Sequence, residues 1–205
     1  MSSGIRLILT TPYSKRSNKR RASLLFLKEG VKKIRTQGSL LPSSKYLGRR
    51  IVKRIPMRDK VVIVELGAGT GAFTEMILAK MPKNGTLLAF ETNHILTEHL
   101  RKTLIDPRLF IIEDDAARLY KHLEEHSLPP ADCIVSGLPF GDFNRAKRQR
   151  LLSAIRDGLG DGGLYLQFQY LPVSLQHIKK MFRAKIIGFE MRNFPPAFLY
   201  ECKKK

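Results

Sequence analysis

Residues 61–71, Val-Val-Ile-Val-Glu-Leu-Gly-Ala-Gly-Thr-Gly, constrain the fold of this chain more than any other stretch. The four apolar residues at its start predict a strand that is buried on both faces of a parallel sheet. The glycines let the backbone turn tightly and approach a ligand where a Cβ would collide. Glu91 ends a second apolar run, residues 86–90, so we expect its carboxylate at the next strand tip, where it can accept both hydroxyls of a ribose. The pattern predicts a cofactor loop of the nucleotide type.

The spacing of the glycines separates two classes of cofactor. Dinucleotide sites use G-x-G-x-x-G, which aims a helix N-terminus at a pyrophosphate. Here the run is Glu65-x-Gly67-x-Gly69-x-Gly71, and a carboxylate beside the loop would repel a pyrophosphate but suits a cation. The run resembles motif I of the class I S-adenosylmethionine-dependent methyltransferases, whose ligand carries a sulfonium and an ammonium. The resemblance implies S-adenosylmethionine as the cofactor; a glycine-rich turn without a ligand is the alternative.

The resemblance implies further cofactor contacts at other strand ends. Asp115, followed by Ala116, ends the third strand, where this fold commonly uses an acid to accept the adenine amine. A helix N-cap is the alternative role, and both can hold at once. The fourth strand ends at residues 136–140, beside the expected methyl group. The residues expected to bind the cofactor are Ser44, Glu65, Gly67, Gly69, Thr70, Glu91, Thr92, Asp115, Ala116, Ser136, Gly137 and Leu138.

Gly137 bears on the substrate. In base-amine methyltransferases the matching loop is [Asn/Asp]-x-Pro-[Tyr/Phe], whose side-chain oxygen holds the planar amine. A glycine supplies no such acceptor, so this departure argues against a nucleobase. As catalytic candidates we expect Phe140 to desolvate the amine, Tyr170 to accept a proton, and Tyr46 to line the pocket. Ordinary packing is the alternative for Tyr46, and no residue is a compelling general base.

Four segments narrow the resemblance: residues 38–44, 136–139, 167–170 and 192–197. Together they resemble the small bacterial phospholipid N-methyltransferases, from about residue 24 to the end of the chain. The resemblance implies N-methylation of an amino-lipid head group, phosphatidylethanolamine towards phosphatidylcholine, at the membrane surface. Sister enzymes that methylate ornithine lipids could share the pattern. A ribosomal RNA adenine N6-dimethyltransferase is a second hypothesis, because it shares the fold and often a basic N-terminus, and a non-catalytic module is a third.

Strands and helices alternate from residue 61 onward, which predicts βαβ units and a parallel sheet covered on both faces. The expected strands are 61–66, 86–91, 108–112, 132–136 and 163–169, and the expected helices are 72–81, 94–105, 116–126, 144–159 and 172–182. Two last strands, 185–191 and 197–202, predict an antiparallel closing pair. The fold class is therefore α/β, with the Rossmann-like seven-stranded sheet of class I methyltransferases and an antiparallel C-terminal hairpin, plus an N-terminal helical extension.

Positive charge is concentrated in the first 60 residues, which hold 17 Lys or Arg against two acids and so contribute most of the net charge of +19. We expect a basic disordered lead over residues 1–20, basic amphipathic helices over 21–58, and the methyltransferase domain over 59–205. Such basicity indicates an anionic partner, either nucleic acid or a membrane. The first helix carries Leu24, Leu27, Val31 and Ile34 on one face. That face favours an anionic membrane over nucleic acid, because RNA would bind only the charged residues, whereas a membrane would also bury the apolar ones. The alternative is that the apolar face packs on the methyltransferase domain.

The remaining features bear on compartment and metal binding. Cys133 and Cys202 lie in apolar strand-like contexts, which favours reduced core thiols in a cytosolic protein. We expect a monomer located in the cytoplasm and peripherally associated with the inner face of the cell membrane. Residues 122–126 match the inverted zinc-protease motif H-x-x-E-H, but they offer no third ligand in context, so no metal is expected.

Overall fold

The computed structural model describes residues 45–170, 172–193 and 195–205. All of the described residues belong to one compact unit, residues 40–205. The predicted basic lead over residues 1–20, the predicted first helix that carries Leu24, Leu27, Val31 and Ile34, and the expected cofactor contact Ser44 lie outside the described residues.

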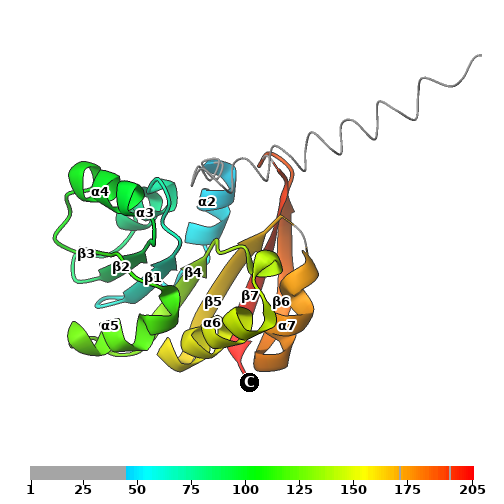
Figure 1. Cartoon of the computed structure of the whole chain (residues 1–205). Coiled ribbons are helices and arrows are strands. Elements are labelled where there is room, and N and C mark those ends of the chain that lie inside the picture. The colour runs from blue at the N-terminus through cyan, green and yellow to red at the C-terminus, as the bar shows by residue number, and fades with distance from the viewer. Residues whose placement is uncertain (1–44, 171, 194) are drawn as a thin grey trace, which may run out of the picture. The chain divides into compact units, whose positions relative to one another are not determined.

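A seven-stranded sheet with the order β3-β2-β1-β4-β5-β7-β6 forms the centre of this unit (Figure 1). The strands are β1 (Val62–Leu66), β2 (Thr86–Phe90), β3 (Leu109–Ile112), β4 (Ala131–Ser136), β5 (Leu159–Gln169), β6 (Phe182–Glu190) and β7 (Ala197–Lys204). The first five are mutually parallel, and β7 is antiparallel to both β5 and β6. Strand β6 therefore runs in the same direction as β5, and the predicted antiparallel closing pair is confirmed.

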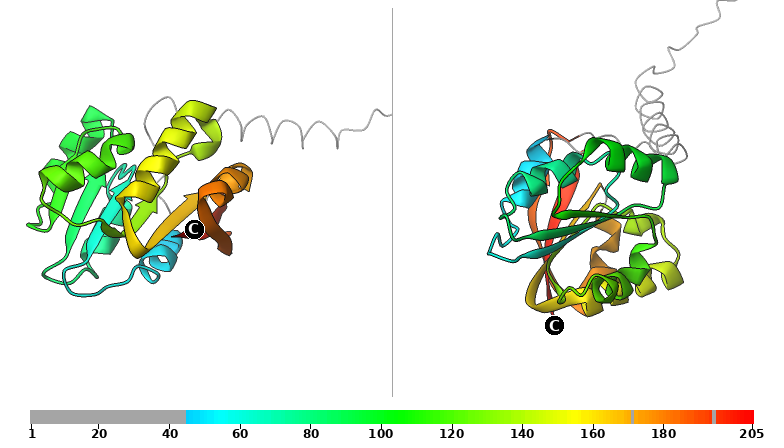
Figure 2. Two further views of the ribbon diagram at one scale, coloured as in Figure 1. Left: turned by 90° about the horizontal axis from the view of Figure 1, so that it is seen from below. Right: turned by 90° about the vertical axis from the view of Figure 1, so that its left-hand side faces the viewer.

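Helices cover both faces of the sheet, as the right-hand view of Figure 2 shows. The helices α2 (Lys45–Val52), α3 (Ala72–Leu78) and α4 (His94–Thr103) lie on one face, and α5 (Leu119–Glu125), α6 (Arg145–Gly158) and α7 (Leu175–Met181) lie on the other. Short 3₁₀ turns η1 (Ala116–Arg118), η2 (Phe140–Asp142) and η3 (Pro172–Ser174) precede the last three helices. The predicted Rossmann-like methyltransferase fold is confirmed.

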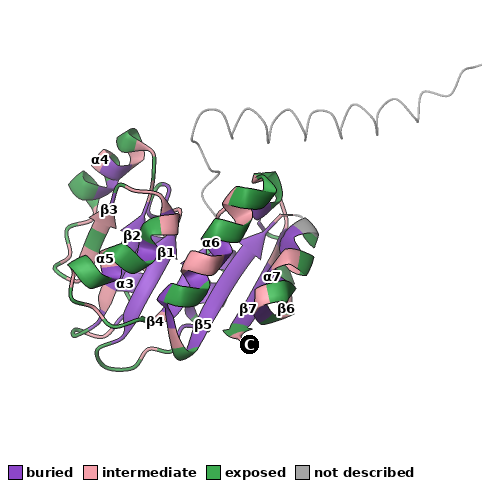
Figure 3. Ribbon diagram, turned by 60° about the horizontal axis from the view of Figure 1, so that its bottom comes forward, coloured by how far each residue is buried: buried purple, intermediate pink, exposed green. Residues whose placement is uncertain are grey.

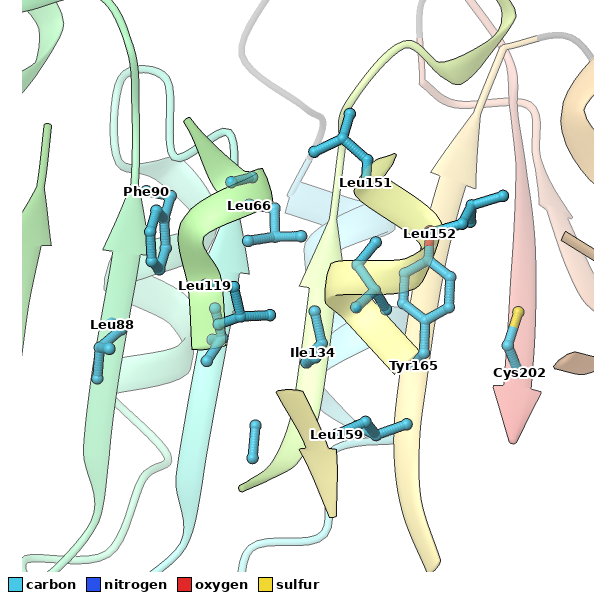
Figure 4. Packing of buried hydrophobic residues seen from close by; sticks show 14 of the residues in the cluster. Leu66, Leu88, Phe90, Leu119, Ile134, Leu151, Leu152, Leu159, Tyr165 and Cys202 are labelled. Carbon is cyan, nitrogen blue, oxygen red and sulfur yellow. The ribbon is translucent and has the colours of Figure 1, made fainter. Parts of the chain in front are cut away.

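The core consists of two main apolar layers, one on each side of the sheet. Strand β1 is buried at all five positions, so it contributes alternate side chains to the two layers. Figure 4 shows part of the layer beneath α5 and α6, where Leu66, Ile134 and Tyr165 meet side chains of both helices. Figure 3 shows that the central strands are buried while the outward faces of these helices are exposed. Cys133 and Cys202 are both buried and free, as the sequence predicted.

Strand β5 begins earlier than the sequence indicated, at Leu159 instead of residue 163. Leu159 pairs with Ala131 and Leu164 with Cys133, so residues 160–163 form an irregularity in the pairing. The run Gly160-Asp161-Gly162-Gly163 has the composition of a turn, which conceals its place within a strand.

Helix α2 packs into the domain core. Its residues Leu47, Ile51 and Val52 are buried, and a Cβ at Gly48 would lie 2.4 Å from the sulfur of Met76 on α3. The close approach explains why a residue without a side chain stands at Gly48. The predicted domain boundary at residue 59 stays a prediction. In the part of the chain that the structure describes, no helix has both the length and the apolarity needed to cross a bilayer.

Gly71 offers a test of how the glycine loop is packed. It precedes α3 with φ of 88°, and a Cβ there would lie 2.7 Å from Leu100 Cδ2 and 2.9 Å from Leu104 Cδ1. Gly162 has a similar φ of 73° with no atom within 4 Å. We expect Gly71→Ala to lower the free energy of unfolding by about 2–5 kcal/mol, from backbone strain plus collision, and Gly162→Ala by about 1–2 kcal/mol, from strain alone. Urea unfolding measures both; equal losses would show that the collision is relieved without cost.

Candidate active site

Backbone hydrogen bonds bring the carboxyl ends of β1, β2 and β4 together. The amides of Gly67 and Ala68 donate to the carbonyl of Phe90 at 2.9 and 3.0 Å. On the other side, the amide of Gly137 donates to the carbonyl of Leu66 at 3.2 Å. In open α/β sheets, ligands bind beyond the carboxyl ends of the strands at such a point.

Three backbone amides orient the carboxylate of Glu91. Its Oε2 accepts a hydrogen bond from Gly69 at 3.0 Å, and its Oε1 accepts from Thr92 and Asn93, both at 2.9 Å. Gly69 and Gly67 both have positive φ, and the loop leads directly into α3. The acid that the sequence assigned to a ribose is thus fixed against the glycine loop before any ligand binds. Thr70 is exposed in the same loop, and Thr92 is exposed beside Glu91.

Glu65, on β1 below the loop, is a buried carboxyl group. Its Oε2 accepts a hydrogen bond from Thr74 Oγ1 at 2.7 Å. The pKa of Glu65 is raised to about 8, chiefly by burial; the hydrogen bond from Thr74 opposes the rise, and the nearby charge of Glu91 adds to it. Since a nearby cation favours the ionised form, a positively charged ligand above the loop would stabilise this carboxylate.

Asp115 caps the turn that follows β3. Its Oδ1 accepts a hydrogen bond from the amide of Ala117 at 2.8 Å, and Arg150 lies 3.9 Å from its Oδ2. The capping role that the sequence offered as an alternative is therefore present, and the contact with an adenine amine stays a prediction. The next residue, Ala116, is buried, and the preceding acid, Asp114, pairs with His122 at 3.0 Å.

An aromatic ring fills the space beside Gly137. A Cβ at this position would lie 2.4 Å from Phe168 Cζ and 2.9 Å from its Cε1. The ring of Phe168 stacks on Phe73 at the start of α3, with the centroids 5.0 Å apart. Any side chain at 137 would therefore collide with Phe168. Both rings are more than nine-tenths buried.

Two glutamines hold the loop that follows β4. The side-chain amides of Gln167 and Gln169 both donate to the carbonyl of Leu138, each at 3.1 Å. Gln169 in turn accepts a hydrogen bond from Ser174 Oγ at 2.6 Å. Ser136 is buried, and its Oγ accepts the amide of Leu138 at 3.2 Å. Residues 167–170 entered the sequence analysis only as part of the family resemblance, with no role assigned to Gln167 or Gln169; the alternation of these two residues with apolar residues on β5 was the available signal.

The three catalytic candidates do not come together. Phe140 is fully buried in the layer beneath α6, with its ring 5.8 Å from that of Phe143. Tyr170 packs against the layer on the opposite face, so these two rings do not form one wall. Tyr46 on α2 is partly exposed, and the guanidinium of Arg192 lies 4.0 Å from its ring centroid.

Tyr170 is a neutral phenol at neutral pH. Burial raises its pKa, and a hydrogen bond with Asn193 opposes the rise only in part. Its hydroxyl can donate or accept a hydrogen bond, but it holds no negative charge with which to remove a proton.

The H-x-x-E-H stretch serves packing and ion pairing. His122 lies 3.0 Å from Asp114 and 3.1 Å from Glu125, and its ring meets the ring of Phe90 edge to face. Across the described ranges, no three His, Cys, Asp or Glu side chains are arranged to hold a metal ion.

The arrangement fits the cofactor expected from the sequence. Beside Gly67, a Cβ would lie 3.1 Å from Leu138, so the backbone there can be approached closely only because side chains are absent. Glu91 has a fixed carboxylate at the place where the sequence predicts a contact with a ribose, and Glu65 is a buried acid below the loop, whose ionised form a cationic ligand would stabilise. A neutral dinucleotide-type loop would lack this second acid.

Comparison with known proteins supports this assignment. The model of the ribosomal RNA adenine dimethylase family matches residues 34–138, about half of the chain. An ornithine lipid N-methyltransferase from Singulisphaera acidiphila is 32% identical over 181 residues, which are 87% of this chain and 94% of that protein. A probable ribosomal RNA small subunit methyltransferase A from Haloquadratum walsbyi is 36% identical over 103 residues, which are 45% of this chain but only 31% of that protein.

Solved structures share the fold. A glycopeptide N-methyltransferase in complex with S-adenosylmethionine superimposes with a TM-score of 0.57 and 14% identity. The superposition covers 78% of this chain and 93% of that one.

We expect the stability of the ligand-free protein to depend on pH through Glu65. Because its folded pKa is raised from 4.5 to about 8, its stabilising contribution is complete below pH 4.5 and is lost as pH rises towards 8. The difference corresponds to roughly 5 kcal/mol. In Glu65→Gln, which retains an acceptor for Thr74 but does not titrate, this loss should be absent. Urea unfolding at several pH values measures it, and parallel profiles for the two proteins would contradict the buried acid.

Glu91→Ala should weaken binding of S-adenosylmethionine by about 1.5–3 kcal/mol, the scale of hydrogen bonds to a charged group. Glu91→Gln, which keeps one acceptor oxygen for the loop amides, should lose less. Isothermal titration calorimetry compares the three proteins, and equal affinities would remove Glu91 from the site.

The family match and the long alignment to one relative agree with the seven-stranded fold, the glycine loop and its two acids. The chain belongs to the ribosomal RNA adenine dimethylase family, and it is an S-adenosylmethionine-dependent methyltransferase.

Proposed function

We propose that this enzyme methylates the primary amine of an amino-lipid head group at a membrane surface, with an ornithine lipid as the substrate. The observation that carries the proposal is the contact between Gly137 and Phe168. In enzymes acting on a base amine, a side-chain oxygen at the position of Gly137 holds the planar nitrogen. Here the ring of Phe168 takes that space, so an aromatic surface replaces the acceptor.

The carbonyl of Leu138, next to Gly137, already accepts two hydrogen bonds. A carbonyl oxygen has two lone pairs, and that of Leu138 accepts from both Gln167 and Gln169. A planar amine aligned by hydrogen bonds to this loop would have to displace one of these amides. A flexible alkyl amine has no such requirement, because its nitrogen can rotate to meet the methyl donor.

The chemistry of the amine agrees with an apolar wall. When bound, S-adenosylmethionine supplies a methyl group on a positively charged sulfur. A lysine-like amine has a pKa near 10.4 and is mostly protonated at neutral pH, so it must give up a proton to solvent water before it can attack. The rings of Phe168 and Phe73 disfavour an ammonium through desolvation, and the neutral Tyr170 can accept a hydrogen bond. The protein otherwise aligns the groups and excludes water.

The two relatives differ in how much of their own length aligns with this chain. The ornithine lipid enzyme aligns along nearly its whole length, whereas the aligned region is less than a third of the ribosomal RNA enzyme from Haloquadratum walsbyi. The full-length match therefore favours a lipid head group. Phosphatidylethanolamine, expected from the sequence resemblance, has the same primary amine and is the second head group to test.

We expect the enzyme to work at a membrane surface, because its proposed substrate is a lipid and its net charge is positive. A net charge of +19 attracts an anionic surface, and a peripheral position at the inner face of the cell membrane would bring the enzyme to its lipid. Dimethylation of adenine in ribosomal RNA is the second candidate function, favoured by the family model.

Incubation with labelled S-adenosylmethionine and separate substrates tests the proposal. The substrates are vesicles that contain an ornithine lipid, vesicles that contain phosphatidylethanolamine, and unmodified ribosomal RNA. We expect label in the organic phase with the ornithine lipid. Label in phosphatidylethanolamine alone would change the head group, and label in the RNA with both vesicles blank would overturn the proposal.

Gly137→Ala should lower kcat/KM for the lipid by about tenfold or more, because a buried overpacked contact costs about 1–3 kcal/mol. Phe168→Leu removes the atoms that the new Cβ would meet, so the double variant should recover part of the loss. Gly160→Ala is the control, since a Cβ there meets its nearest atom at 3.4 Å. If the double variant is as poor as the sum of the single ones, the two positions do not act through this contact.

A further inference from the structure

Arg192, in the connection between β6 and β7, presents a fixed guanidinium group at the carboxyl edge of the sheet. Its Nε and Nη2 donate to the two carboxylate oxygens of Glu190 at 2.9 and 3.3 Å, and one of its faces covers the ring of Tyr46 on α2, 4.0 Å from the ring centroid. The side chain of Arg192 is nevertheless 62% exposed, and among the described residues none accepts a hydrogen bond from its Nη1. Nη1 and the second hydrogen of Nη2 therefore form another fork of donors, of the kind that matches a carboxylate.

The charge around this group is positive. Arg50 on α2 lies 3.5 Å from the carboxylate of Glu190, and it donates to the carbonyl of Phe189 at 3.0 Å. Its guanidinium crosses the backbone of Gly188, where a Cβ would collide with it. Glu190 is 3% exposed, and it is the one acid in the described part of the chain that pairs with Arg50 or Arg192. A single carboxylate between two guanidinium groups leaves one positive charge uncompensated.

The connection between β6 and β7 also reaches the candidate active site. Asn193 is 2% exposed, donates to the carbonyl of Pro195 at 2.7 Å, and shares a hydrogen bond with Tyr170 at the end of β5. Tyr170 packs against the same layer as Phe168, whose ring fills the space beside Gly137. The same short connection thus carries the exposed guanidinium group and a contact with the proposed amine pocket.

The dimensions of an ornithine head group fit this arrangement. In the strand order β4-β5-β7-β6, the start of β7 lies two strand spacings, about 10 Å, from the tip of β4. An ornithine head group carries its primary amine at one end of an alkyl chain and a free carboxylate at the other. With the amine beside Gly137 at the tip of β4, the carboxylate would point along the edge of the sheet towards β7, and the side chain of Arg192 would span the remaining distance. Phosphatidylethanolamine carries its phosphate on a shorter chain.

We propose that Arg192 is a specificity-determining residue, which binds the carboxylate of the ornithine head group through its exposed Nη1 and Nη2. Glu190 and Tyr46 hold the guanidinium group in place before the lipid arrives, so little side-chain freedom is lost on binding. The inference rests on the proposed lipid function, and it adds the part of the head group, remote from the amine, that the enzyme recognises.

Two lipids dispersed in detergent test this recognition. One is an ornithine lipid, and the other is an N-acyl putrescine, which has the same amine and alkyl chain but no carboxylate. Arg192→Gln should raise KM for the ornithine lipid about 10- to 100-fold, the scale of a hydrogen bond between charged groups. The kcat should stay unchanged, because the carboxylate is remote from the reacting atoms. With the N-acyl putrescine, the variant should equal wild type.

Two further variants serve as controls. Arg192→Lys keeps the charge but loses the fork of donors, so it should recover only part of the lost affinity. Arg49→Gln removes one charge from an exposed position on α2, and Arg49 forms no salt bridge with the acids that the structure describes. It should leave KM for both lipids at the wild-type value.

The outcomes separate this inference from the proposed function. An equal loss with both lipids would show that Arg192 only holds the connection in place, and no loss with either would show that it does not meet the substrate. Equal use of the two lipids by wild type, or a loss confined to phosphatidylethanolamine, would also overturn the inference. In each of these cases wild type still methylates a lipid amine, so the proposed function stands. Absence of methyl transfer from wild type to any of these lipids would overturn the proposed function, and the inference with it.

Discussion

The site depends on the hydrogen bonds between the glycine loop and the end of β2. Two loop amides donate to the carbonyl of Phe90, and a third donates to Glu91, whose carboxylate also accepts two amides from its own strand end. These contacts fix a carboxylate against an exposed backbone at a sheet edge. Side chains on the neighbouring strands can then vary while the backbone that faces the cofactor stays the same. In this way one fold can accept amines of different shape.

Much of the fold could be predicted from the sequence because its signals are local. The alternation of apolar strands with amphipathic helices, and the acid twenty residues after Gly71, gave the sheet and the glycine loop. The exception, residues 160–163, shows the limit of such reasoning. A glycine-rich stretch resembles a turn even where strand pairing on either side of it keeps it within β5.

The substrate side of the site could be predicted only in part. The missing acceptor at Gly137 was evident, but its physical cause, the ring of Phe168, is a contact between residues more than thirty positions apart. The committed carbonyl of Leu138 likewise depends on side chains from another strand. Phe140 and Tyr170 were grouped by their chemistry, and the structure places them against opposite layers, because Phe140 lies in the loop after β4 and Tyr170 follows β5, and the two segments direct their side chains to opposite faces of the sheet.

The packing of Gly137 against Phe168 also limits how the enzyme can evolve. A single change to asparagine at 137, the first step towards a base-amine site, would meet the ring at once, and loss of the ring alone would leave a void beside the loop. Because each single change would disturb this packing, we expect the two positions to change together. The contact between Gly137 and Phe168 would then slow any change from one class of substrate to another on the same fold.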